Sequence, residues 1–182
     1  MRTTLLITAL AIGDLLPAVE PVARLSFDAP PGRPIVVEMK DAPITVIFFL
    51  SALCPMSGDY SERIVDLERR FAPQGARLIL VNANAHESDS MVEQHRRNSA
   101  LTLPVWRDRQ ARAAARLEAH ATPTVVVLDR QGAVRYWGSI DDSRSPARVR
   151  RRYLEDALQA LLAGQSPALP RTKVMGCAIK AE

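Results

Sequence analysis

Apolar residues along the chain fall into short continuous runs, which alternate with stretches of mixed apolar and charged residues. The run Ile44–Leu50 is apolar on both faces, which is typical of a central strand in a sheet covered on both sides. Similar runs predict further strands at residues 25–27, 35–39, 78–82, 103–106, 125–128 and 134–137.

The stretches between these runs have the three-to-four-residue apolar spacing of amphipathic helices. The first predicted helix extends from Cys54 to about Phe71 and ends at the segment Ala72–Gly75. Three more helices are expected: one begun by Ser90 in a capping box with Glu93 and running through Arg97, one capped by Asp108 and ending near Ala119, and one begun by Ser145 and Pro146 and ended by Gly164. This alternation predicts an α/β fold with a central, largely parallel sheet that helices cover on both faces and an antiparallel pair closes.

The chain has 182 residues, enough for one domain with extensions and a core of its own. A hydrophobic fraction of 47% and a charged fraction of 24% are ordinary for a soluble globular protein. We divide it into an N-terminal signal or extension (1–20), a domain (21–164) and a tail (165–182). The net charge is +4, but no aromatic residues or binding motif accompany the arginines, so nucleic acid is not an expected partner.

The N-terminal segment has two readings. Arg2 precedes an apolar run, Leu5–Ile12, which resembles a short secretory signal and favours export to a periplasmic or extracytoplasmic compartment. Asp14 fits that pattern poorly, so the alternative is an N-terminal extension of a cytoplasmic protein. The run is too short and too interrupted to span a membrane, and stable membrane insertion is not expected.

Cys54 is the leading candidate for chemistry, because it follows the apolar run Ile44–Leu50 and begins the helix after it. Free N–H groups and the positive dipole end of a helix stabilise an anion at that point, so the pKa of this thiol should be lowered. Pro55 suits the first helical position, where no N–H is needed. The alternative is a buried structural cysteine.

The remaining composition adds few constraints on the site. Two cysteines, Cys54 and Cys177, cannot form a disulfide scaffold, and neither they nor the scattered His86, His95 and His120 have the spacing of a metal motif. We therefore expect neither a metal site nor a cofactor.

The order of elements, with Cys54 at the first long helix and Thr122-Pro123 before a late strand, resembles the thioredoxin fold. Within that superfamily the chain is most similar to the redoxin or peroxiredoxin-like branch, of the AhpC/TSA type. The resemblance is carried by Cys54-Pro55-Met56-Ser57, Val81-Asn82-Ala83-Asn84, Thr122-Pro123, Tyr136-Trp137-Gly138-Ser139-Ile140-Asp141-Asp142 and Gly176-Cys177. These motifs span about residues 44–179 and imply a central mixed sheet with helices on both faces.

The motifs also depart from those of the relatives. Ser57 stands where thioredoxins have their second cysteine, and Leu50 stands where copper chaperones of this fold have one. Ser51 matches the hydroxyl residue three positions before the peroxiredoxin cysteine, but Ile47 replaces the proline four positions earlier. A copper chaperone is thus disfavoured, and the peroxidase motif is partial.

The resemblance assigns roles to the matching residues. Cys54 would be the nucleophile, and Ser57, one helical turn on, would donate a hydrogen bond to its thiolate. Pro55, Thr122 and Pro123 would contact the substrate, with the Thr122–Pro123 peptide bond cis and beside Cys54. Three readings of Cys177 remain open: a resolving thiol, a structural disulfide with Cys54, or an unpaired thiol.

Two classes of function follow. The first is a thiol-dependent oxidoreductase, either a peroxiredoxin-like antioxidant or a one-cysteine disulfide reductase, with a peroxide or a disulfide as substrate and an external thiol as reductant. The second is a non-catalytic thioredoxin-like module, in which Cys54, Cys177 and His120 could hold a soft metal ion.

Overall fold

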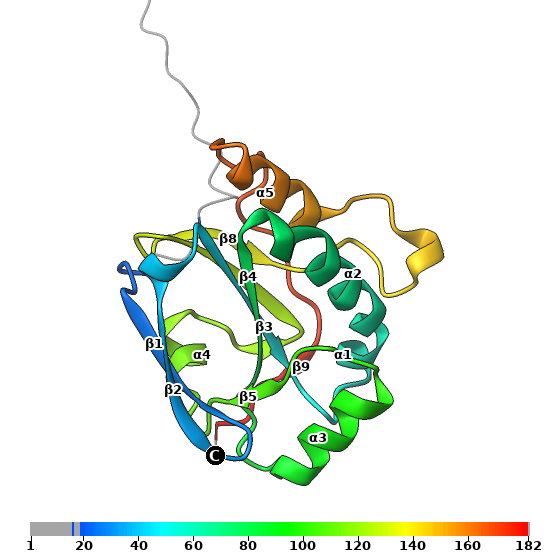
Figure 1. The fold of residues 1–182 in the computed structure, drawn as a ribbon. Helices are drawn as coiled ribbons and strands as arrows, with labels where there is room; N and C mark the ends of the chain where they lie inside the picture. The colour runs from blue at the N-terminus through cyan, green and yellow to red at the C-terminus, as the bar shows by residue number, and fades with distance from the viewer. Residues whose placement is uncertain (1–15, 17–18, 182) are drawn as a thin grey trace, which may run out of the picture.

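The computed structural model describes residue 16 and residues 19–181, and its centre is a seven-stranded sheet (Figure 1). The strand order is β2-β1-β5-β4-β3-β7-β8. The strands are β1 (Arg24–Ala29), β2 (Arg33–Glu38), β3 (Ile44–Leu50), β4 (Ala76–Asn82), β5 (Val105–Arg107), β7 (Thr124–Asp129) and β8 (Val134–Gly138). Because β3, β4 and β5 run parallel and the other neighbouring pairs run antiparallel, the sheet is mixed.

Helices cover both faces of this sheet, as expected. They are α1 (Pro55–Asp59), α2 (Ser61–Phe71), α3 (Asp89–Asn98), α4 (Arg112–Arg116) and α5 (Tyr153–Leu162), with 3-10 turns η1 (Met39–Asp41), η2 (Ala72–Gln74) and η3 (Pro146–Arg148). Figure 1 shows α2 and α5 together on one side, with α4 on the other.

Strand β3 separates two apolar clusters, because its side chains alternate between the faces of the sheet. Phe48 packs with the residues of α2 and α5, and Phe49 packs with those of α4 and the β1–β2 hairpin. Both rings are fully buried, and burial of such a side chain contributes about 1.5–3 kcal/mol. The two-sided core therefore fixes the end of β3, which leads directly to Cys54.

The first predicted helix is divided in the structure. One continuous helix from Cys54 to Phe71 was expected, but α1 ends at Asp59 and α2 begins at Ser61. Tyr60 lies at the break, where its ring is buried and the guanidinium carbon of Arg63 is 3.9 Å from the ring centroid. The break accompanies the burial of this large ring under the helix pair.

The start of α3 also differs from the expectation. Ser88, and not Ser90, is the N-cap, and its hydroxyl accepts a hydrogen bond of 3.2 Å from the N–H of Met91. Glu93 does not close a capping box, because its carboxylate pairs with Arg96 and Arg97. Ser88 lies two residues before Ser90, and the apolar periodicity does not distinguish these two positions as the helix start.

The last helix begins later than Ser145 and Pro146, which open only the short turn η3. The following backbone is held by a loop instead of continuing as a helix: the N–H of Arg150 donates to the Asp142 carboxylate over 2.9 Å. The α5 helix then begins at Tyr153. Asp108 was expected to cap a helix that ends near Ala119, but the N-cap of α4 is Ala111 and the helix ends at Arg116. Asp108 contacts this helix differently, accepting a hydrogen bond of 2.8 Å from Ala114 N.

The described part of the tail packs against the domain. On β8, the backbone N–H of Trp137 donates to the backbone oxygen of Pro170 over 2.9 Å, and the backbone oxygen of Trp137 accepts from Thr172 N over 3.0 Å. The tail then forms β9 (Cys177–Ala178), which pairs antiparallel with the short strand β6 (Ala121–Thr122). Figure 1 follows this segment, in red, along the domain to β9.

Apart from residues 16, 19 and 20, the proposed segment 1–20 lies outside the described residues. Over the part of the chain that is described, no helix is long and apolar enough to cross a membrane.

Candidate thiol redox site

Cys54 lies in the loop between β3 and α1, where it is the N-cap residue of α1. Its extended backbone ends the loop, and Pro55 takes the first helical position, as expected. The residue is only 2% exposed, whereas Leu53 beside it is 56% exposed. The thiol is therefore held under a surface formed by its neighbours and is not freely open to solvent.

The Thr122–Pro123 peptide bond is cis and lies beside Cys54, as the resemblance implied. The Sγ of Cys54 donates a hydrogen bond of 3.3 Å to the carbonyl oxygen of Thr122. Both Thr122 and Pro123 are buried. This loop forms one wall of the site and fixes the direction of the thiol.

Cys177 is held against the same loop by strand pairing. In the β6–β9 register Cys177 stands opposite Thr122, whose hydroxyl donates to Cys177 O over 3.4 Å. The side chains of Cys54 and Cys177 are hydrogen-bonded to each other, and no disulfide joins them in this structure. The pairing of β9 with β6 thus holds Cys177 beside Cys54 before any disulfide forms.

Gly176 allows this close approach. A Cβ at this position would overlap the carbonyl group of Thr122, so a side chain could fit only if β9 moved away. The glycine before Cys177 thus has a steric function, which the sequence motif alone did not reveal.

The two thiols have opposite pKa shifts. Burial raises the pKa of Cys54, but hydrogen bonds from the Cys177 thiol and the Ser57 backbone outweigh it, and the net shift is downward. The pKa of Cys177 is raised, first by its hydrogen bond to Cys54 and then by burial. The pair therefore favours a thiolate at Cys54 and a protonated thiol at Cys177.

Ser57 lies next to Cys54, but not with the predicted contact. Its backbone is the group that hydrogen-bonds the Cys54 thiol. Its hydroxyl oxygen instead accepts a hydrogen bond of 3.1 Å from the N–H of Ser51, and the side chain is fully buried. The hydroxyl holds the loop ahead of Cys54, while the helix backbone contacts the sulfur.

His120 is not brought into the site as a side chain. The side chain of His120 is exposed. Its backbone carbonyl accepts a hydrogen bond of 2.9 Å from Ile179 N. Within the described residues, no group of three or more His, Cys, Asp or Glu side chains could hold a metal ion. The soft-metal alternative would thus have only the two cysteines as ligands.

A buried polar cluster beneath the Cys54 loop was missed by sequence reasoning. Glu87 accepts hydrogen bonds from Ser51 and Ala52 of this loop, and also from Asn82 at the end of β4. Arg107 donates to Asn82 from the next strand. The available signal was a charged residue soon after a strand end, but many exposed loop residues share that pattern.

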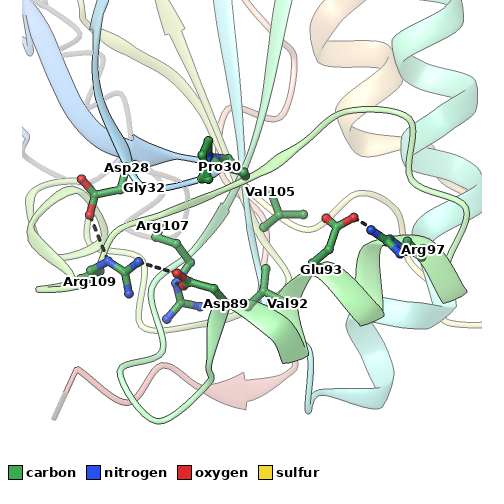
Figure 2. Close-up of a pocket in the computed structure, with 11 residues that line it drawn as sticks. Asp28, Pro30, Gly32, Asp89, Val92, Glu93, Arg97, Val105, Arg107 and Arg109 are labelled. Atoms are coloured by element: carbon green, nitrogen blue, oxygen red, sulfur yellow. Dashed lines mark hydrogen bonds and ion pairs between the residues drawn. The ribbon is translucent and has the colours of Figure 1, made fainter.

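A cavity of about 280 Å³ lies between the β1–β2 turn, α3 and β5 (Figure 2). Cys54, Cys177 and Thr122 do not line it. Charged side chains in it are paired with one another, Arg109 with Asp28 and Asp89. This cavity is separate from the thiol pair.

Solved structures with the same fold include three from bacteria. A hypothetical protein from Sinorhizobium meliloti is 24% identical with a TM-score of 0.79, over 89% of this chain and 93% of that one. An uncharacterized conserved protein from Geobacillus kaustophilus is 23% identical with a TM-score of 0.80, over 91% and 93%. A putative thiol:disulfide interchange protein DsbE from Chlorobium tepidum is 17% identical with a TM-score of 0.64, over 81% and 99%. The fold is thus thioredoxin-like.

The family comparison agrees with this fold. No curated protein matches the chain. The model of the AhpC/TSA family matches residues 31–137, which include Cys54 and the Thr122–Pro123 loop. Together, the family and the fold support an oxidoreductase function in general, with redox substrates and a reductant as partners. Because the match spans more than half of the chain, the protein belongs to the AhpC/TSA family.

Proposed function

We propose that the protein is a thiol–disulfide oxidoreductase in which Cys54 is the nucleophile and Cys177 the resolving thiol. The supporting observation is the contact between the two thiols, with the pKa of Cys54 lowered and that of Cys177 raised. A thiolate attacks a disulfide far faster than a thiol does, and a second thiol nearby can then resolve the mixed disulfide and release the product.

The reaction proceeds in two exchanges. The Cys54 thiolate attacks one sulfur of a substrate disulfide, a mixed disulfide forms, and the first substrate thiolate leaves and takes up a proton. Cys177 then loses its proton and attacks the Sγ of Cys54, forming the Cys54–Cys177 disulfide and releasing the second substrate thiol. The substrate gains two electrons and the protein loses two, which an external thiol reductant restores.

We infer that a disulfide substrate contacts the Thr122–Pro123 loop. The Thr122 carbonyl accepts from the Cys54 thiol, so a substrate at this loop would lie beside the Cys54 sulfur, while the backbone edge of Thr122 is itself paired with β9. Pro55 is exposed at the start of α1, next to Cys54, and it completes the proposed substrate surface.

Peroxide reduction is the second candidate, and the AhpC/TSA family match favours it. The Cys54 thiolate would attack a peroxide oxygen to give a sulfenic acid and, after protonation, an alcohol or water. Cys177 would then condense with the sulfenic acid, releasing water. However, the hydroxyl of Ser51 donates to Glu87 at 2.5 Å, so its proton is not directed toward a peroxide. We therefore rank disulfide exchange first.

We also propose that the protein is exported, on the basis of the apolar run Leu5–Ile12 after Arg2. An extracytoplasmic location would suit a protein that exchanges disulfides, since disulfides persist in oxidising compartments. Fractionation of cells that express the full chain would test this, and recovery of uncleaved protein in the cytoplasm would contradict it.

The test treats the reduced protein with glutathione disulfide or with hydrogen peroxide and follows intact mass. Wild-type protein should lose two hydrogens and become resistant to alkylation at both cysteines. Cys177→Ser should stop at a glutathione adduct with glutathione disulfide and at a sulfenic acid with peroxide, and Cys54→Ser should not react at a comparable rate. Equal rates in Cys54→Ser and wild type would refute the proposal and favour the non-catalytic module.

A further inference from the structure

The loop between β4 and α3 (residues 83–88) carries a buried carboxylate that the proposed chemistry does not use. Glu87 is only 1% exposed. One carboxylate oxygen accepts from Ser51 Oγ at 2.5 Å, and the other accepts from Ala52 N at 2.7 Å and Asn82 Nδ2 at 2.6 Å. A charge withdrawn from water is tolerated only with such complete hydrogen bonding, so these three donors are held tightly.

The same loop also holds the strand that carries Cys177. Asn84 Oδ1 accepts from Lys180 N over 3.0 Å, and Ala85 N donates to Lys180 O over 2.8 Å. The Cys54 loop and the Cys177 strand, which are far apart in the sequence, are therefore both attached to one short segment.

Arg107, on the neighbouring strand β5, fixes that segment in turn. Its guanidinium donates to Asn82 Oδ1 over 2.7 Å and to the backbone oxygen of Glu87 over 2.6 Å. The residue is 95% buried. A planar guanidinium bonded at two points makes a rigid support, so movement of the loop as a whole is resisted.

We propose that Glu87 is a positioning residue, which places the Cys54 loop so that the Cys54 and Cys177 thiols stay within reaction distance. The inference deepens the proposed function and rests on it. Ser51 and Ala52, the residues that Glu87 binds, lie within three positions of Cys54. A small displacement there moves the Cys54 sulfur relative to Cys177, and intramolecular reactions are highly sensitive to such displacements.

Replacing Glu87 by glutamine tests this with little change in size. Glutamine has one acceptor oxygen where the carboxylate has two, and three donors face this side chain. If the oxygen of the glutamine side chain faces Ala52 N and Asn82 Nδ2, its amide protons point at Ser51 Oγ. This hydroxyl oxygen already accepts a hydrogen bond of 3.2 Å from Leu53 N. The hydroxyl proton of Ser51 then loses its partner, and the loop before Cys54 is loosened.

The experiment equilibrates the full-length protein with mixtures of glutathione and glutathione disulfide and quantifies the Cys54–Cys177 disulfide by alkylation and intact mass. The equilibrium gives the effective concentration of one thiol with respect to the other. We expect Glu87→Gln to lower this effective concentration about tenfold, because intramolecular reactions slow sharply when the reacting groups are misplaced. The rate of the bimolecular reaction of Cys54 with glutathione disulfide should change far less than the effective concentration. General destabilisation of the protein would not affect these two quantities differently.

Glu93→Gln is the matched control. Its carboxylate lies on α3 and pairs only with Arg96 and Arg97, away from both cysteine segments. The effective concentration in this variant should equal that of wild type, and an equal fall in both variants would overturn the assignment to Glu87.

Ser51→Ala gives a second route if Glu87→Gln does not fold. It removes one donor to Glu87 but keeps the buried charge hydrogen-bonded by Ala52 and Asn82. We expect a smaller fall in effective concentration, and in the double variant the two effects should be non-additive.

The outcomes separate the two proposals. If wild-type protein forms no Cys54–Cys177 disulfide at any glutathione ratio, the proposed function itself fails. If wild type forms it and folded Glu87→Gln, or Ser51→Ala in its place, keeps the same effective concentration, the positioning role is refuted while the function stands.

Discussion

Replacing Cys177 by alanine should raise the pKa of Cys54. In the structure the Cys177 thiol is the largest of the interactions that lower this pKa, and only burial of Cys54 is larger, acting in the opposite direction. A hydrogen bond to a charged group contributes about 1.5–3 kcal/mol, and a thiol is a weak donor, so we take the lower end of that range. Since 1.36 kcal/mol corresponds to one pKa unit, the expected rise is about one unit.

Two effects limit the rise of the Cys54 pKa in Cys177→Ala. Alanine opens some space over Cys54, which is 2% exposed, and the added solvation favours the thiolate. The backbone hydrogen bond from Ser57 stays in place, so part of the lowering survives. The rise should therefore not exceed about one unit, and near neutral pH the thiolate fraction should fall by up to about tenfold.

The assay is the pH dependence of iodoacetamide labelling at Cys54, resolved by peptide mass so that Cys177 is counted separately in wild type. The wild-type midpoint should lie below the free-thiol value of about 8.5. Cys177→Ser is the matched control, because its hydroxyl can still donate a hydrogen bond and should keep the midpoint near that of wild type. A midpoint in Cys177→Ala equal to or below that of wild type would show that Cys177 does not stabilise the thiolate.

Three further predictions follow from the same contacts. Gly176→Ala should displace β9, because the added Cβ would overlap the Thr122 carbonyl. The rate at which the Cys54–Cys177 disulfide forms should fall about tenfold, and an unchanged rate in stopped-flow oxidation would contradict this. Oxidation to that disulfide should raise the melting temperature in calorimetry, because cross-linking so long a loop stabilises by up to about 4–5 kcal/mol, and the rise should vanish in Cys54→Ser and in Cys177→Ser. Arg63→Ala should lower the free energy of unfolding by about 3–5 kcal/mol in urea titrations, because the buried Asp141 carboxylate loses the guanidinium bonded to it at 2.5 Å. A loss below about 1 kcal/mol would indicate that water takes the place of the guanidinium.

Apolar runs predicted the longer strands of the sheet well, because five to seven residues are enough to show the pattern, whereas β5 has only three residues. β3 spans Ile44–Leu50 as expected, and the strands expected at residues 25–27, 35–39, 125–128 and 134–137 correspond to β1, β2, β7 and β8. Helix ends were less predictable, since they depend on contacts from distant segments. The backbone after η3 is held at Arg150 by Asp142, and no pattern in residues 145–164 encodes that partner.

The same distinction applies to the site. The place of Cys54 at a helix start could be predicted from a local pattern. The cis Thr122–Pro123 bond was implied by the resemblance, which a Thr-Pro pair before a strand helped to carry. The position of Cys177 depends on tertiary pairing between β6 and β9, and no local pattern chose among the three readings of this residue.

Glu87 is the clearest case of a residue that sequence alone could not reveal. Its role arises only when β3 and β4 lie side by side in parallel, because their carboxyl ends then bring Ser51 and Asn82 to the same place. A carboxylate entering there from the following loop is buried by both strand ends and by Arg107 behind them. The element that supports the thiol pair is thus a product of strand order, and its effect on the exchange reaction is measurable without changing either cysteine.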